Sequence, residues 1–209
     1  CESVLTPGGW MDHARIGIDE AGFITGVSAL RDDEFRAGLR GHVVPGMPNL
    51  HSHAFQRQMA GLTETGGGQA DSFWTWRELM YGLADRITPE ALQAIAAFLQ
   101  VDMLEAGYTS CAEFHYLHHQ PGGQPFVNPA EMSKALIEAA DGSGMALTLL
   151  PVLYCRGGFA SDSVSARQQR FHNSPEQFMR LLSACGELIG NRPLHQLGIA
   201  PHSLRAVAQ

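Results

Sequence analysis

Two histidines separated by one residue, His51 and His53, follow the apolar run "VVPGMPNL" and precede a polar segment. Side chains at positions i and i+2 of a strand point to the same side, so a strand here would aim both imidazoles one way. Two such imidazoles can take adjacent corners of a Zn²⁺ tetrahedron. The pair alone is weak evidence, because histidines in polar loops are often solvated. The apolar strand pattern before it favours metal ligation.

Composition argues against two classes of partner. The 209 residues contain 14 Lys and Arg against 21 Asp and Glu, a net charge of -7, whereas nucleic-acid binding requires a basic face. No apolar span of membrane length and no secretory signal pattern are present, so we expect no membrane partner. The four cysteines are scattered without a CxxC pair, which favours reduced thiols and a cytoplasmic location.

The first 45 residues have the pattern of short strands. The segments "ARIGID" and "FITGVSAL" flank Asp19–Gly22, a predicted hairpin turn in which Gly22 takes a positive φ. These strands are too few to close a core. We therefore expect a small β layer rather than a complete domain.

From about residue 43 onward, strands and helices alternate. We predict strands over 42–51, 108–116, 145–154 and 194–203, and helices over 71–83, after Thr88, after Asn128 and after Ser174. Thr88 is a predicted cap, and Asn128 and Ser174 each begin a predicted capping box. The apolar run 145–154 is typical of a strand covered on both faces, hence of a parallel sheet. The glycine-rich segment 66–68 lacks the spacing of a phosphate loop and is predicted to be a flexible loop.

This alternation makes four βα units. An open doubly wound sheet and a barrel both fit that count. A (β/α)₈ barrel usually takes about 250 residues, and only roughly 165 follow the β layer. If the fold is a barrel, the chain contains about half of one.

The segment "VVPGMPNLHSHAFQRQMAGLTE", residues 43–64, resembles the first-strand metal motif of the amidohydrolase superfamily. "SFWTWRELMY", "CAEFHY" and "GIAPHSLRAV" extend the resemblance along the chain. They narrow it to deiminases that convert N-formimino-L-glutamate to N-formyl-L-glutamate and ammonia in histidine degradation. The resemblance implies an α/β fold, a metal-dependent-hydrolase (β/α)₈ TIM-type barrel. Residues 46–209 would hold about its first four βα units, and residues 1–45 part of a small β-sandwich domain.

The resemblance also implies one Zn²⁺ per subunit, held in part by His51 and His53. The residues it implies in substrate binding are Gln56, Arg77, Tyr116, His202 and Arg205. Without it, we would interpret Gln56 and Arg77 as surface residues and Tyr116 as a packing residue. The chemistry agrees with the implied roles, because the planar arginine fork suits the two carboxylates of the substrate.

The resemblance places the other metal ligands and the acid/base groups beyond Gln209, so no catalytic residue is assigned here. We expect an isolated 209-residue chain to be inactive. The expected partner is a small dicarboxylate, with a homodimer as the candidate assembly. Two alternatives stay open. One is a related deaminase acting on a nucleobase or guanidine-like substrate; the other is a non-catalytic metal-binding or interaction module.

Several further residues are assigned structural roles. His115 has strand parity opposite to Tyr116, so at most one of the two should face a pocket. We predict that His118 and His119 are solvated and that Cys111 and Cys155 are small buried hydrophobes. Trp74 and Trp76 are predicted to pack beside Arg77 and position it.

Overall fold

The chain divides into two compact units, Cys1–Met47 and Pro48–Gln209. The computed structural model describes residues 1–34, 38–63, 72–159 and 161–207. The predicted glycine-rich loop at 66–68 lies outside these residues. None of the helices in the described part is both long and apolar enough to cross a membrane.

The first unit contains two small sheets. Strands β1 (Ser3–Thr6), β2 (Gly9–Asp12) and β5 (His42–Val43) form one sheet in the order β2-β1-β5. Strands β3 (Ala14–Ile18) and β4 (Ile24–Ala29) form an antiparallel hairpin. Whether these sheets belong to a sandwich stays a prediction.

The turn of that hairpin has the predicted chemistry. The Asp19 carboxylate accepts hydrogen bonds from the backbone N–H groups of Ala21 and Phe23, at 3.0 and 2.9 Å. Gly22 has a φ of 89°, a value that glycine adopts without a Cβ penalty. Ile18 and Ile24, which flank the turn, are 64% and 65% exposed. The hairpin prediction is confirmed.

The second unit is built on a parallel sheet. Its strands are β6 (Met47–Ser52), β7 (Tyr108–His115), β8 (Ala146–Leu153), β9 (His195–Leu197) and β10 (Ala200–Pro201). The order is β10-β8-β7-β6, and β9 also pairs with β8. Strand β8 is parallel to β7, β9 and β10. Strands that follow one another in the chain lie side by side, without the reversal of order that defines a doubly wound sheet. This favours a TIM-like half-barrel over the open sheet.

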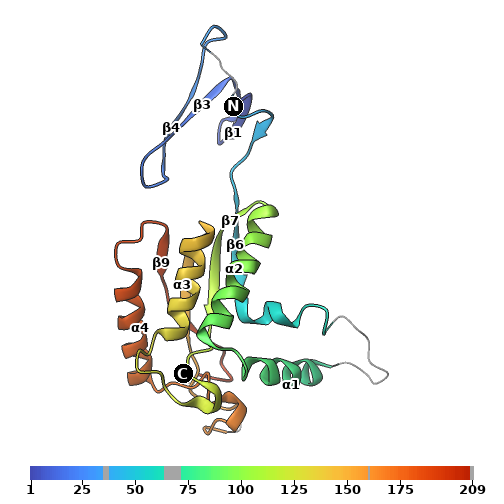
Figure 1. The fold of residues 1–209 in the computed structure, drawn as a ribbon, viewed down its shortest axis with the longest axis vertical. Coiled ribbons are helices and arrows are strands. Elements are labelled where there is room, and N and C mark those ends of the chain that lie inside the picture. Colours follow the sequence, from blue (N-terminus) through green and yellow to red (C-terminus); the bar gives the residue numbers. More distant parts are fainter. Residues whose placement is uncertain (35–37, 64–71, 160, 208–209) are drawn as a thin grey trace. The chain divides into compact units, whose positions relative to one another are not determined.

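Three helices cover one face of this sheet. Helix α3 (Glu131–Ser143) packs against both α2 (Pro89–Glu105) and α4 (Pro175–Ile189), as Figure 1 shows. Thr88 caps α2 by accepting the N–H of Ala91 at 3.2 Å, and Ser174 forms a complete capping box with Gln177. These two helix starts are confirmed.

The start of α3 differs from the prediction. Its N-cap is Ala130, and the predicted Asn128 capping box does not form. Instead the Asn128 side chain accepts the N–H of Ala130 at 3.0 Å, a local turn that delays the helix until Glu131.

Two predicted strands are each divided in the structure. The predicted strand 42–51 is divided into β5 and β6 by residues 44–46, and the predicted strand 194–203 is divided into β9 and β10 by residues 198–199. Strand β8 also differs, because its residues alternate between buried and half-buried instead of being covered on both faces. In the described residues the helices cover only one of those faces.

Candidate active site

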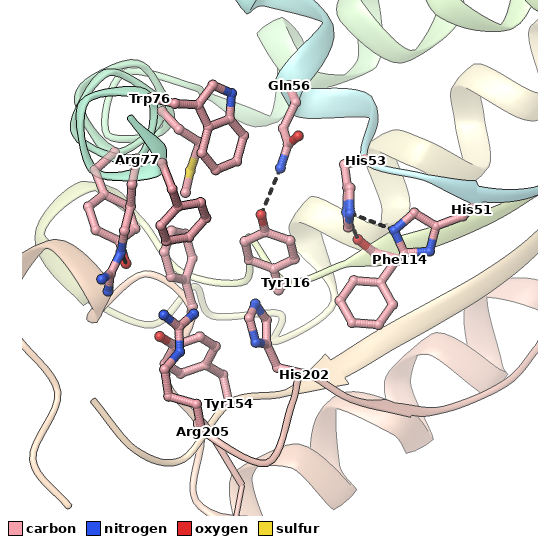
Figure 2. Close-up of a pocket in the computed structure, with 14 residues that line it drawn as sticks. His51, His53, Gln56, Trp76, Arg77, Phe114, Tyr116, Tyr154, His202 and Arg205 are labelled. Carbon is pink, nitrogen blue, oxygen red and sulfur yellow. Dashed lines mark hydrogen bonds between the residues drawn. The ribbon is translucent and has the colours of Figure 1, made fainter. Parts of the chain in front are cut away.

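One pocket of about 320 Å³ gathers every site residue predicted from the sequence. They are His51, His53, Gln56, Arg77, Tyr116, His202 and Arg205. They come from the ends of β6 and β7, from η1 (Ala54–Met59), from α1 (Phe73–Ala84) and from the segment after β10. Figure 2 shows the two histidines at one end and the two arginines at the other. The pocket therefore has a nitrogen-ligand end and a cationic end.

The two histidines converge. Their Nε2 atoms lie 2.9 Å apart, and their ring planes are perpendicular. In a tetrahedral zinc centre with Zn–N bonds of about 2.0–2.1 Å, two nitrogens lie roughly 3.3 Å apart. Asn49 supports the strand end by accepting the backbone N–H of His51 at 3.1 Å. The spacing of the pair fits adjacent ligands of one metal ion.

The second ring nitrogen of His53 has a fixed partner. His53 Nδ1 lies 3.0 Å from the carbonyl oxygen of Phe114, which can only accept, so Nδ1 carries the proton. Burial, together with the nearby His51, lowers the pKa of His53 despite that hydrogen bond. The neutral ring thus directs the lone pair of Nε2 into the pocket, the form required for metal binding.

A buried carboxyl group supports the same turn from β7. Glu113 is 3% exposed, and its Oε1 accepts the N–H of Ala54 at 2.7 Å. The Ser52 hydroxyl also forms a hydrogen bond with this carboxyl group. Burial raises the pKa of Glu113 to about 7. Glu113 therefore bonds the residue on each side of His53, through the Ser52 side chain and the Ala54 backbone, a role that the sequence analysis missed.

Within the described residues, no group of three His, Cys, Asp or Glu side chains is arranged to hold a metal. Two imidazoles fit part of a zinc site in geometry and donor chemistry, and a catalytic zinc requires a third protein ligand.

Arg77 projects from α1 with its guanidinium held on two sides. Its Nε donates to the Tyr81 hydroxyl at 2.7 Å, one helical turn away. Its guanidinium carbon lies 5.0 Å from the Tyr81 ring centre and 5.6 Å from that of Trp74. Trp74 is 62% exposed, so it contacts Arg77 without belonging to a core, while Trp76 lines the pocket.

Gln56 and Tyr116 meet across the pocket. Gln56 Nε2 donates to the Tyr116 hydroxyl at 2.9 Å, and burial raises the pKa of this phenol. His115, on the opposite face of the strand, is 1% exposed and does not line the pocket. The strand-parity prediction is confirmed.

His202 and Arg205 are placed by the end of β8. The His202 N–H donates to Leu153 O at 3.0 Å, and Ala206 O accepts the N–H groups of Cys155 and Arg156. Burial, followed by the charges of Arg205 and other neighbours, lowers the pKa of His202 to about 4. Its imidazole is neutral at physiological pH, so the arginines supply the positive charge.

None of the described residues that line the pocket is acidic. Arg77 and Arg205 therefore lack an anionic partner among the lining side chains. A pocket of this composition favours a ligand that brings its own negative charge.

Two predictions about histidines outside the pocket are wrong. His118 is 1% exposed, and its Nε2 contacts Val152 O at 3.0 Å. His119 is half-buried, with its Nε2 2.7 Å from His172 O. Both backbone N–H groups donate to Arg170 O, which folds this polar loop into the structure. Cys111 is buried as predicted, and Cys155 is half-buried.

Sequence reasoning also missed several aromatic lining residues, among them Phe73, Tyr81, Phe114, Tyr154 and Phe171. Two of them carried a usable signal. Tyr81 lies four residues after Arg77 on one helix, and Tyr154 ends a long apolar run, where barrel strands present functional side chains.

Comparison with known proteins gives consistent matches. The chain is 47% identical over 209 residues to the curated formimidoylglutamate deiminase of Pseudomonas aeruginosa, covering 99% of this chain and 45% of that protein. The crystal structure of an amidohydrolase from Brucella melitensis superposes with a TM-score of 0.89 at 46% identity, over 99% of this chain and 46% of that one.

A more distant structure shares the fold. A zinc complex of atrazine chlorohydrolase from Arthrobacter aurescens has a TM-score of 0.67 at 17% identity, over 98% of this chain and 46% of that one. The chain spans about half the length of each of these relatives. The model of the amidohydrolase family matches residues 42–208. With that match over most of its length, the chain belongs to the amidohydrolase family.

Proposed function

We propose that this chain supplies the first four βα units of a zinc-dependent deiminase that hydrolyses N-formimino-L-glutamate to N-formyl-L-glutamate and ammonia. The main support for this function is a single pocket with two converging imidazoles at one end and two arginines at the other. The similarity to a formimidoylglutamate deiminase supports the choice of substrate.

The cationic end suits the glutamate part of the substrate. Arg77 and Arg205 present planar forks that can bind carboxylates bidentately. Neutral His202 offers a hydrogen bond without adding charge. A nucleobase carries no carboxylate and has little use for two such groups.

The opposite end suits hydrolysis of the formimino group. His51 and His53 would hold Zn²⁺ together with ligands from elsewhere in the barrel. A zinc ion held there would lower the pKa of a bound water, so that a nucleophile is available at neutral pH. The oxygen of one water replaces the terminal nitrogen on the formimino carbon, and that nitrogen leaves as ammonia. Gln56 and Tyr116, between the two ends, would orient the substrate.

The proposal is tested by ammonia release from the zinc-loaded enzyme containing this chain, with N-formimino-L-glutamate, adenosine, cytosine and guanine as parallel substrates. Release from formiminoglutamate alone supports the proposal. Release from a nucleobase alone would keep the metal site and overturn the substrate. No release from any of the four by a protein with bound zinc would favour another substrate or a binding role.

A further inference from the structure

The Tyr154 hydroxyl is held by a buried amide whose orientation is fixed. Gln168 Oε1 accepts the Ser165 N–H at 2.8 Å, so the other end of the amide must be Nε2. That Nε2 donates to the Tyr154 hydroxyl at 2.7 Å and to Gly157 O at 3.1 Å. Gln168 is 3% exposed, so water competes little for these bonds.

The Tyr154 oxygen therefore accepts a hydrogen bond from Gln168 and cannot donate to it. The hydroxyl proton must then point away from Gln168, towards another acceptor. Among the described residues, no side chain or carbonyl accepts it. Tyr154 lines the pocket, and burial raises its pKa, so the proton is retained at neutral pH. The unused donor is available to a ligand in the pocket.

The charges around Tyr154 identify the ligand chemistry. Arg205 and Arg77 both act electrostatically on its hydroxyl. Figure 2 shows the Tyr154 oxygen beside the Arg205 guanidinium. The Tyr154 ring also lies 4.7 Å from the His202 ring, in an edge-on contact that fixes its plane. A neutral donor in a pocket with two cations is suited to a carboxylate.

Two other pocket phenols follow the same pattern. Tyr81 accepts from Arg77 Nε, which can only donate, and Tyr116 accepts from Gln56 Nε2. Each of these hydroxyls accepts one hydrogen bond, and among the described residues neither has an acceptor for its own proton. Tyr154 differs because its amide partner, Gln168, lies outside the pocket lining and is itself fixed by Ser165 and Gly157.

We propose that Tyr154 is a further substrate-binding residue, donating its hydroxyl proton to a substrate carboxylate held by Arg77 and Arg205, with Gln168 as its positioning residue. The identity of the substrate rests on the proposed function. Tyr154 would add a neutral donor of fixed direction to the two cationic groups. The pocket would then select a carboxylate by the direction of its hydrogen bond as well as by its charge.

The test is the Tyr154→Phe substitution in the zinc-loaded enzyme, which removes the hydroxyl and keeps the ring. Gln168 Nε2 retains Gly157 O, so the amide keeps a partner. Tyr108→Phe, outside the pocket, is the matched control. We expect KM for N-formimino-L-glutamate to rise about tenfold or more with kcat nearly unchanged, because the lost bond is to a charged group in both ground and transition states.

Two analogues locate the bond. N-formimino-4-aminobutyrate lacks the α-carboxylate, and N-formimino-2-aminobutyrate lacks the γ-carboxylate. The KM effect of Tyr154→Phe should vanish on one analogue and persist on the other. An unchanged KM on the full substrate, an equal effect on all three compounds, or a loss confined to kcat would overturn the proposal.

Calorimetric binding of N-formyl-L-glutamate separates this inference from the proposed function. A wild-type enzyme that releases no ammonia contradicts the function, while weaker dicarboxylate binding by Tyr154→Phe still supports the tyrosine. If Tyr154→Phe fails to fold, Gln168→Met carries the test. This substitution keeps the Tyr154 phenol but removes the amide donor that positions it. We expect KM to rise, by less than it does in Tyr154→Phe. Unchanged binding in whichever variant folds would contradict the inference.

Discussion

His53 Nδ1 donates to the carbonyl oxygen of Phe114 over 3.0 Å, and this bond determines which ring nitrogen faces the pocket. The carbonyl belongs to the neighbouring strand β7, so the tautomer of the histidine depends on the pairing of the sheet. A ligand histidine held in this way presents Nε2 to the metal without needing to reorient.

Replacing His53 by Ala should reduce zinc affinity by more than the roughly 10–100-fold typical of losing a supporting residue, since a direct ligand is removed. Chelator competition on the full enzyme measures this affinity. His172→Ala removes a histidine outside the pocket and should leave zinc binding unchanged. Equal affinities in wild type and His53→Ala would contradict the metal assignment.

Arg205→Ala should raise KM for N-formimino-L-glutamate about tenfold to a hundredfold, with a smaller change in kcat, because a charge-assisted carboxylate contact is lost. Arg205→Lys keeps the charge without the planar fork and should recover only part of the loss. Arg180→Ala, on the exposed face of α4, serves as control. Steady-state kinetics that do not distinguish Arg205→Ala from wild type would refute the clamp.

The raised pKa of Glu113 predicts that the stability of the fold depends on pH. Its folded-state pKa of about 7 lies above its ordinary value of 4.5 because burial disfavours the charge. The buried charge of ionised Glu113 therefore destabilises the folded state. This loss of stability is absent below about pH 4.5 and complete above about pH 7. Glu113→Gln keeps an acceptor for the Ala54 N–H and removes this charge. Its free energy of unfolding should exceed that of wild type by up to about 3 kcal/mol at high pH.

Denaturant unfolding of both proteins at about pH 5 and pH 8 checks this, with the difference between them growing as pH rises. A Glu113→Gln variant that loses stability relative to wild type at high pH would show that the carboxylate is stabilised as an ion.

Arg170 ties the end of α1 to the loop after β7. Its buried guanidinium donates to the carbonyl oxygens of Ala84, Ile87 and His119. Arg170→Met leaves three carbonyls without that donor and should lower the free energy of unfolding by about 3 kcal/mol or more. Arg167→Met removes an exposed ion pair with Glu78 and should cost less than about 1 kcal/mol. Similar unfolding midpoints for the two variants would argue against this role.

Local sequence signals predicted much of the fold. Thr88 and Ser174 marked helix starts because their side chains bond only a few residues away. Asn128 was misleading because the same chemistry also stabilises a turn before the helix. The divisions of the predicted strands at Pro45 and Gly198 depend on which neighbouring strand is available, which the local sequence does not reveal.

The site was predictable where a residue carried a motif and not where it acts through a distant partner. His51, His53 and Arg205 lie in recognisable segments and do line one pocket. Glu113 and His118 depend on contacts 59 and 34 residues away in the chain. Those contacts exist only once β6, β7 and β8 have assembled, so spacing could not predict their burial.

The proposed function requires that one pocket hold both the metal and a dicarboxylate. Anomalous diffraction at the zinc edge, from crystals of the enzyme grown with zinc and N-formyl-L-glutamate, tests it most directly. We expect a zinc peak against Nε2 of His51 and His53, with ligand carboxylates against Arg77 and Arg205. A zinc peak elsewhere, or a ligand whose carboxylates avoid both arginines, would contradict it.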